Sequence, residues 1–200
     1  MTAALVVVGG YLLGSVPFGY WVVRWLKGTD IRTLGSGNIG ATNVWRAYGW
    51  KLGLPIVVLD VAKGFLPALL GLVYGSQLVG VLAGAAAMLG HWRPLYLRLS
   101  KGGKTVATAG GVTFALAPRA AACCLVAWIA IFLVSRYASV ASMLSAILLP
   151  VFAWVFGAGW PVVAFGALAA VAVLLLHKAN IRRLFEGTES RFQFRRPARA

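Results

Sequence analysis

Long apolar runs separated by short, mostly basic segments dominate the sequence. The first run covers 1–23 without a charged side chain and ends at Arg24 and Lys27. The later runs cover 52–72, 77–92, 105–117, 120–134 and 137–177. One membrane-spanning helix needs about 20 residues, and the last run is long enough for two. The pattern therefore predicts an all-α, polytopic membrane protein with seven transmembrane helices.

Glycine and proline positions predict where these helices bend or end. Pro17 and Gly19 interrupt the first run, so we expect a kink there. A turn at 75–76 separates the second span from the third, and the segment 157–161 separates the last two. The fourth span, 105–117, is the shortest, but without it the basic C-terminal segment would lie on the other side of the membrane.

The distribution of Lys and Arg predicts the orientation, because cytoplasmic loops are enriched in basic residues. If the N-terminus lies outside, the segments 27–51, 93–104 and 135–139 and the C-terminal tail all face the cytoplasm. Of the 19 Lys and Arg residues, only Arg119 then lies outside. We therefore expect the N-terminus outside and the C-terminus in the cytoplasm.

Composition excludes several other classes of protein. Hydrophobic residues make up 60% of the 200 residues and charged residues 12%, whereas soluble domains are nearer ~25% charged. This excludes a disordered chain and argues against a soluble globule. The net charge of +15 fits anionic lipid headgroups and an anionic substrate, and it does not indicate nucleic acid here. We expect one membrane domain over 1–189 and a basic tail over 190–200.

A glycine-rich polar stretch, 35–46, reads G-S-G-N-I-G-A-T-N-V-W-R. It contains GxGxxG, but no strand precedes it, so it is not a dinucleotide fingerprint. We expect Asn38 to cap a short helix, Ile39 to Tyr48, whose N-terminus would bind an anion. A flexible polar loop is the alternative, and the density of hydrogen-bond donors favours phosphate binding. The candidate residues are Ser36, Gly37, Asn38, Gly40, Thr42, Asn43 and Arg46.

Two further polar stretches are predicted to lie on the same side of the membrane. Gly102, Gly103 and Lys104 form a glycine turn before a helix, which favours a second anion, although basic residues flanking a span look similar. His177 and Asn180 are three residues apart and would share a helix face at the end of the last span. His177 could act as a base, donate to phosphate or cap the helix. Glu186 is expected to be structural, pairing with Arg.

Polar residues within the predicted spans have simpler explanations. Asp60 and Lys63 are three residues apart and should pair with each other, so Asp60 is expected to be structural, while Lys63 is also placed to reach the site. Ser142 is a candidate for substrate binding, although such serines more often pack between helices. No cluster of residues suggests a metal ion, and no cofactor is expected.

These motifs together resemble one family of membrane enzymes. The stretches 14–19, 35–43, 59–64, 101–104 and 177–184 resemble the bacterial acyl-phosphate:glycerol-3-phosphate acyltransferases, and the likeness extends from about residue 5 to 189. The resemblance implies transfer of a fatty acyl group from acyl phosphate to the sn-1 hydroxyl of glycerol 3-phosphate, giving lysophosphatidic acid and phosphate. It also implies seven helices in the bacterial inner membrane, with the active site facing the cytoplasm.

The resemblance also assigns roles to residues. It implies that Ser36, Arg46, the glycines and Lys104 of the second stretch, His177 and Asn180 are essential, and that Glu186 is structural. The proton acceptor would be His177 or the departing phosphate, and we favour the phosphate. The expected partners are the two substrates and membrane lipid, with no obligatory protein partner. A transporter or channel for a phosphorylated anion is the alternative, but only Asp60 and Lys63 would line a polar path through the helices.

Overall fold

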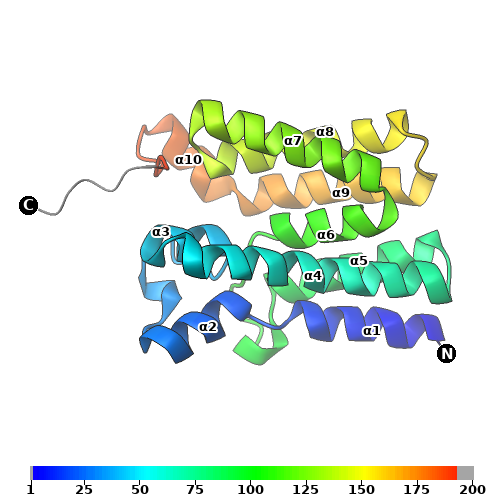
Figure 1. Ribbon diagram of the computed structural model, residues 1–200, viewed down its shortest axis with the longest axis horizontal. Coiled ribbons are helices and arrows are strands. Elements are labelled where there is room, and N and C mark those ends of the chain that lie inside the picture. Colours follow the sequence, from blue (N-terminus) through cyan, green and yellow to red (C-terminus); the bar gives the residue numbers. More distant parts are fainter. Residues whose placement is uncertain (1, 193–200) are drawn as a thin grey trace, which may run out of the picture.

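The computed structural model describes residues 2–192, and helices form most of this part of the chain (Figure 1). The helices are α1 (Thr2–Gly14), α2 (Phe18–Lys27), α3 (Ala41–Tyr48), α4 (Trp50–Tyr74), α5 (Gln77–Trp92), α6 (Val106–Leu116), α7 (Pro118–Ser135), α8 (Ala138–Val155), α9 (Trp160–Leu176) and α10 (Lys178–Phe185). Short 3₁₀ turns lie at Ile31–Thr33 and Leu95–Leu97. No described residue forms a strand, so the predicted all-α class is confirmed.

The helices form two groups that lie one above the other in Figure 1. In the N-terminal group, α1 to α6, helix α4 packs on α5 and α6, and α1 packs on α5. In the C-terminal group, α7 to α10, helix α8 packs between α7 and α9. Helix α6 contacts α7 and α9, and α5 contacts α9, so these contacts join the two groups.

Glycines allow the closest of these helix contacts. A Cβ atom added at Gly64 of α4 would lie 2.1 Å from the carbonyl oxygen of Thr108 in α6. A Cβ atom added at Gly111 of α6 would lie 2.0 Å from the carbonyl oxygen of Val61. Small residues let membrane helices approach closely, since lipid gives little hydrophobic drive for their association. This contact fixes the start of α6, and with it Lys104, against α4.

The expected kink in the first apolar run is a complete break. Helix α1 ends at Gly14, α2 begins at Phe18, and Pro17 between them has φ −89° and ψ 68°. The buried ammonium group of Lys63 donates a hydrogen bond to the carbonyl oxygen of Val16 at 3.0 Å. A side chain of α4 therefore satisfies a backbone group that the break leaves without a helical partner.

Several helices have the length and apolar character of membrane spans. Residues Ala3–Lys27, Trp50–Tyr74, Pro118–Ser135 and Ala138–Val155 qualify by length and composition, and α9 with α10 qualifies as a pair bent by 56°. Helix α6 is apolar but has only 11 residues, about 16 Å at 1.5 Å per residue. The multi-pass character is thus supported, while the count of seven spans and the orientation remain predictions.

Helix α3 begins two residues later than expected. It starts at Ala41, and Gly40 precedes it in an extended conformation without a side-chain cap. The Asn38 side chain instead accepts a hydrogen bond from the Gly40 N–H at 2.7 Å. Asparagine often bonds to the backbone two residues ahead and so stabilises a turn. The prediction that Asn38 caps a helix from Ile39 was therefore wrong, because this turn is formed in its place.

Candidate active site

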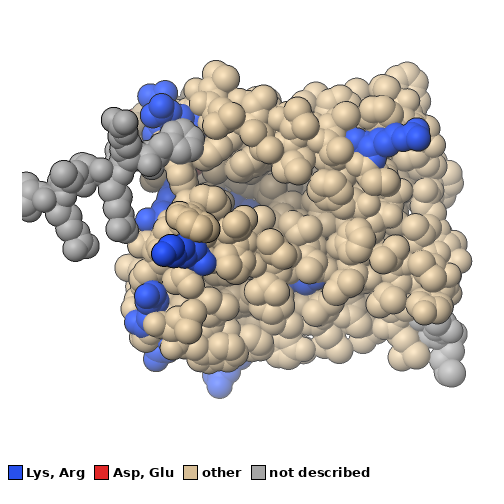
Figure 2. All heavy atoms as spheres, in the orientation of Figure 1, with Lys and Arg blue, Asp and Glu red and all other residues tan. Residues whose placement is uncertain are grey.

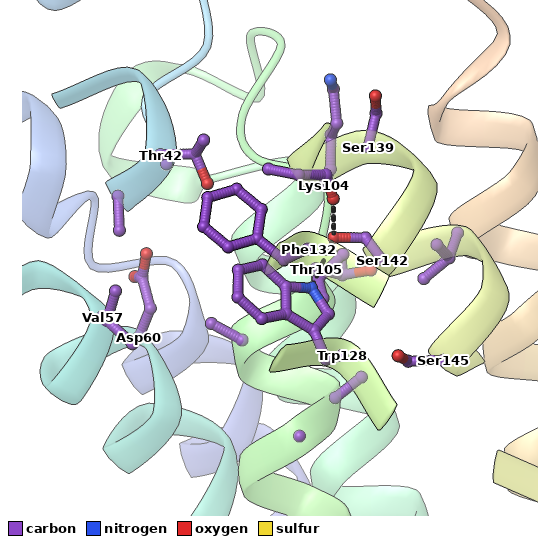
Figure 3. Close-up of a pocket in the computed structure, with 18 of the residues that line it drawn as sticks. Thr42, Val57, Asp60, Lys104, Thr105, Trp128, Phe132, Ser139, Ser142 and Ser145 are labelled. Atoms are coloured by element: carbon purple, nitrogen blue, oxygen red, sulfur yellow. Dashed lines mark hydrogen bonds between the residues drawn. The ribbon is translucent and has the colours of Figure 1, made fainter. Parts of the chain in front are cut away.

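A cavity of about 1330 Å³ lies between the two helix groups. Figure 2 shows the molecular surface hollowed between α4 and α7, and Figure 3 looks into the cavity. Polar residues gather where the loops meet, and apolar residues of α4, α6, α7 and α8 line the rest. The candidate residues that line it are Ser36, Asn38, Gly40, Thr42, Asn43, Arg46, Asp60, Lys104, Ser142, His177 and Asn180.

The buried side chain of Asn43 holds the glycine-rich stretch in place. Its Oδ1 accepts a hydrogen bond from the Ser36 N–H at 3.0 Å. Its Nδ2 donates to the carbonyl oxygens of Ile31, Leu34 and Asn38, at 3.2, 3.0 and 2.9 Å. Because the amide of Asn43 is committed to the loop, its geometry assigns it to positioning Ser36 and Asn38.

The second stretch is attached to the end of α5. The N–H groups of Gly102 and Gly103 donate to the carbonyl oxygens of Trp92 and His91, each at 2.9 Å. A Cβ atom added at Gly103 would lie only 1.8 Å from Nε2 of His91. Gly102 and Gly103 therefore anchor the turn to α5 and do not line the cavity. They place the next residue, Lys104, at the edge of the cavity.

Lys104 joins the second stretch to the third. Its ammonium group donates to Oδ1 of Asn180 at 2.5 Å, and Nδ2 of Asn180 donates to Oε1 of Glu189 at 2.6 Å. Glu189 also accepts hydrogen bonds at 2.7 Å from Ser139 and from Nε of Arg183. This network connects the loop before α6 with α8, with α10 and with the segment that follows α10.

The network changes the acidity of its charged groups. Burial lowers the pKa of Lys104 to about 8, and attraction to Glu189 offsets only part of this effect. Burial opposes ionisation of Glu189, but hydrogen bonds from Asn180, Ser139 and Arg183 hold its pKa below the ordinary value. Glu189 thus stays ionised with its oxygens occupied by donors, which makes it an organiser of the site and a poor proton acceptor.

Arg46 brings a second cation to the same end of the cavity. Its Nη2 donates to the carbonyl oxygen of Ser190 at 2.9 Å. Its Nε is buried and has no hydrogen-bond partner among the described residues, a situation that costs about 1–3 kcal/mol or more for a charged group. Burial also lowers the pKa of Arg46, with attraction to Glu189 acting against the shift. An anion bound here would remove this penalty.

His177 lies at the bend between α9 and α10, where its backbone geometry ends the longer helix. Its Nδ1 lies 2.7 Å from the carbonyl oxygen of Val173. A carbonyl oxygen can only accept, so Nδ1 bears the hydrogen and Nε2 has a lone pair. The side chain lines the cavity. In this tautomer His177 accepts a hydrogen bond from a hydroxyl group rather than donating one.

Other candidates have contacts of their own. Lys63 pairs with Asp60 at 2.8 Å as expected, but Lys63 is not among the residues that line the cavity. The Ser142 hydroxyl lines the cavity, donates to the Ala138 carbonyl oxygen at 2.7 Å and accepts from Nε1 of Trp128 at 3.1 Å. Glu186 pairs with exposed Arg182 at 2.7 Å, on the surface.

Sequence reasoning missed three residues that help build the site. Of the two glutamates near the end of α10, Glu189 rather than Glu186 is buried. Thr105 lines the cavity with φ 63°, and its buried hydroxyl has no hydrogen-bond partner among the described residues; a β-branched residue rarely adopts this backbone conformation. Phe192 also lines the cavity, although it lies beyond the last helix. The sequence contained a signal for Glu189 alone among the three, since Glu189 is the second acidic residue after Arg183.

The fold and this cavity are those of an integral membrane protein with a large cavity that has cations at its polar end. A family model described as glycerol-3-phosphate acyltransferase matches residues 4–187. The chain is also 47% identical over 195 residues to a glycerol-3-phosphate acyltransferase of Desulforudis audaxviator, with 97% of this chain and 98% of that protein covered. The chain belongs to the glycerol-3-phosphate acyltransferase family.

Other relatives and solved structures agree. The glycerol-3-phosphate acyltransferase of Aquifex aeolicus is 45% identical over 196 residues, which cover 96% of this chain and 100% of that protein. Crystal structures of PlsY, an integral membrane glycerol 3-phosphate acyltransferase, match in its glycerol 3-phosphate form (TM-score 0.92, 42% identity) and in its lysophosphatidic acid form (TM-score 0.90, 40% identity). Each match covers 96% of this chain and 96% of that one.

Proposed function

We propose that this glycerol-3-phosphate acyltransferase takes its acyl group from acyl phosphate and transfers it to the sn-1 hydroxyl of glycerol 3-phosphate. The main support is one cavity with two properties. Arg46, Lys104 and Arg191 place positive charge at its polar end, and apolar side chains line most of the remainder. Such a cavity suits one water-soluble phosphate and one phosphate attached to an acyl chain.

We also propose a division of the site between the two substrates. Glycerol 3-phosphate would bind Arg46, Lys104, Ser36, His177 and Asn180. The phosphate of the donor would lie over Gly37 to Thr42 and bind backbone N–H groups other than those of Gly37 and Gly40, which already donate within the loop. Its acyl chain would lie in the apolar part of the cavity. Measuring both substrate affinities in Arg46→Ala tests this division: weaker glycerol 3-phosphate binding is expected, and loss of donor binding alone would contradict it.

The reaction needs little activation, because acyl phosphate is already a mixed anhydride. The glycerol hydroxyl oxygen attacks the carbonyl carbon and forms the ester bond. The bond from that carbon to the phosphate oxygen breaks, and phosphate leaves with the electron pair. The hydroxyl proton passes to the departing phosphate, while Nε2 of His177 orients glycerol 3-phosphate by accepting a hydrogen bond from its other hydroxyl group, at sn-2. Arg46 and Lys104 stabilise the two neighbouring phosphates against their mutual repulsion.

We further propose seven spans in the bacterial inner membrane, with the site facing the cytoplasm. The basic residues support this orientation: Figure 2 has most blue side chains at the end of α2, α3 and α10, while Arg119 belongs to the start of α7 at the other end. In this arrangement α6 is the short fourth span.

The deciding experiment measures phosphate release by purified protein given palmitoyl phosphate and glycerol 3-phosphate, with palmitoyl-CoA as the parallel donor. Release that needs both substrates and yields lysophosphatidic acid is expected. Activity with palmitoyl-CoA alone would keep the acyltransferase and overturn the donor. No activity with either donor, in folded protein, would favour transport of a phosphorylated anion.

A further inference from the structure

The segment that follows α10 lies across the polar end of the cavity. We call Gly187–Phe192 the strap. Glu189, Arg191 and Phe192 of the strap line the cavity. The strap is attached on both sides: the Ser190 carbonyl oxygen accepts from Arg46 of α3 at 2.9 Å, and the Phe192 N–H donates to the carbonyl oxygen of Arg136, after α7, at 2.8 Å.

The ring of Phe192 connects the two helix groups. Its centroid lies 6.1 Å from that of Trp45 in α3 and 5.3 Å from that of Phe132 in α7, both edge to face. Phe132 in turn stacks on Trp128 at 5.0 Å, and Figure 3 shows these two rings beside Lys104 and Ser142. We call Trp45, Phe192, Phe132 and Trp128 the aromatic row; all four residues line the cavity.

The position of the aromatic row matters for the chemistry proposed above. Acyl phosphate reacts with water as well as with alcohols. In that side reaction the water oxygen bonds to the carbonyl carbon, the bond from carbon to phosphate oxygen breaks, and phosphate leaves with the electron pair. The products are a fatty carboxylate, phosphate and a proton. An acyltransferase therefore has to keep bulk water from the carbonyl carbon while glycerol 3-phosphate binds.

We propose that the strap, through Phe192, excludes water from the donor and so directs the acyl group to glycerol 3-phosphate. This inference rests on the proposed use of acyl phosphate. Phe192 is a large apolar side chain that fills the gap between α3 and α7 at the cationic end. Its backbone is fixed by the hydrogen bond to Arg136, and the neighbouring Glu189 is fixed by hydrogen bonds from Ser139, Asn180 and Arg183.

The test compares hydrolysis with transfer in the full-length protein. Phosphate release from palmitoyl phosphate is measured without glycerol 3-phosphate, and lysophosphatidic acid formation is measured with it. In Phe192→Ala we expect hydrolysis, relative to transfer, to rise several-fold. Phe192→Leu, which keeps most of the apolar volume, should restore the ratio. Phe185→Ala is the matched control, because Phe185 is 89% exposed at the end of α10 and should leave both rates unchanged.

A second variant guards against simple misfolding. Truncation after Arg191 removes Phe192 but keeps Glu189, Arg191 and the peptide carbonyl of Ser190, and it should also increase hydrolysis relative to transfer. If either variant is folded, as judged by its thermal unfolding, and keeps the parent ratio, the proposed role of Phe192 is wrong. If the parent itself forms no lysophosphatidic acid from palmitoyl phosphate, the proposed function fails, and this inference fails with it.

Discussion

Lys104 is a half-buried cation at the proposed phosphate site. Its ammonium group donates a hydrogen bond to Asn180 and lies at the edge of the cavity. The cavity has few negative charges that would stabilise the protonated form of Lys104. Burial therefore lowers its pKa to about 8, within the range of an ordinary assay. The positive charge is present below this pH in the substrate-free protein and is lost above it.

This position predicts a pH dependence of substrate affinity. Because phosphate binds the charged form, the KM for glycerol 3-phosphate should stay flat below pH 8 and rise about tenfold per pH unit above it. In Lys104→Arg the charge persists to far higher pH, so the rise should disappear even if the absolute KM is worse. Steady-state kinetics from pH 6.5 to about 9.5 decide the matter; an identical rise in both proteins would assign it to another group.

The residue scale is also where sequence reasoning found most and missed most. Short motifs contain Lys104, His177 and Asn180, and the residue types in these motifs indicate their chemistry from the sequence alone. Glu189 is different. Glu186 lies four residues after Arg182, the spacing of a helical ion pair, so the sequence assigns the structural role to Glu186 and not to Glu189. The chain turns at Gly187, with φ 68°, and this turn brings Glu189 back under α8. Only the folded backbone reveals that reversal.

At the scale of elements, the glycine turn before α6 depends on the end of α5. Gly103 lies against the imidazole of His91, and a Cβ atom there would be 1.8 Å from Nε2. The turn would have to move, and Lys104 would move with it. Gly103→Ala should therefore lower kcat/KM by at least about tenfold, or 1.4 kcal/mol in transition-state stabilisation.

Two further variants show whether this loss arises from the contact. His91→Ala makes room for the added methyl group, so the double variant should recover part of the activity that Gly103→Ala loses. Gly9→Ala in α1 is the control, since nothing lies within 4 Å of the added Cβ atom. It should keep full activity and gain about 0.5–1 kcal/mol of stability. Strict additivity of the two site substitutions would contradict the proposed contact.

The Asp60–Lys63 pair stabilises the packing of α4 on the segment between α1 and α2, where Lys63 also donates to the Val16 carbonyl oxygen. Both side chains are nearly inaccessible, with that of Lys63 1% exposed and that of Asp60 4% exposed. Asp60→Asn leaves Lys63 buried without a counter-charge and should cost about 3–5 kcal/mol, whereas Asp60→Leu with Lys63→Met should cost far less. Thermal unfolding in detergent compares the two proteins. Equal melting temperatures of Asp60→Asn and the parent would contradict an ionised, mutually stabilising pair.

The elements themselves were predictable to different degrees. Apolar length located α4, α7 and α8, and Pro17 marked the break after α1, because both signals are local. The start of α3 was misplaced, since the Asn38 side chain bonds to Gly40 and stabilises a turn instead of a helix cap. The left-handed conformation of Thr105 has no local signal, because the contacts of the loop with α5 and the packing of α6 on α4 impose it.

At the scale of the whole molecule, the cavity lies between two helix groups, and its apolar part is the proposed place for the acyl chain. Ala169 of α9 is buried and lines this part. Ala169→Phe should shorten the space and shift the preference toward short donors, seen as a higher ratio of kcat/KM for octanoyl over palmitoyl phosphate. Leu168→Phe, at a position that is 71% exposed, is the control. An unchanged ratio in Ala169→Phe would place the chain elsewhere.

The residues that form the site lie far apart in the sequence, and this has a consequence for biosynthesis. Arg46 and Lys104 are made first, whereas the groups that hold them, Asn180, Glu189 and Ser190, are made much later in translation. A partly synthesised chain in the membrane has the cations but lacks the parts that position them. A chain that has not yet reached residues 180–190 therefore lacks a positioned site, and under the proposed mechanism it should not consume the donor.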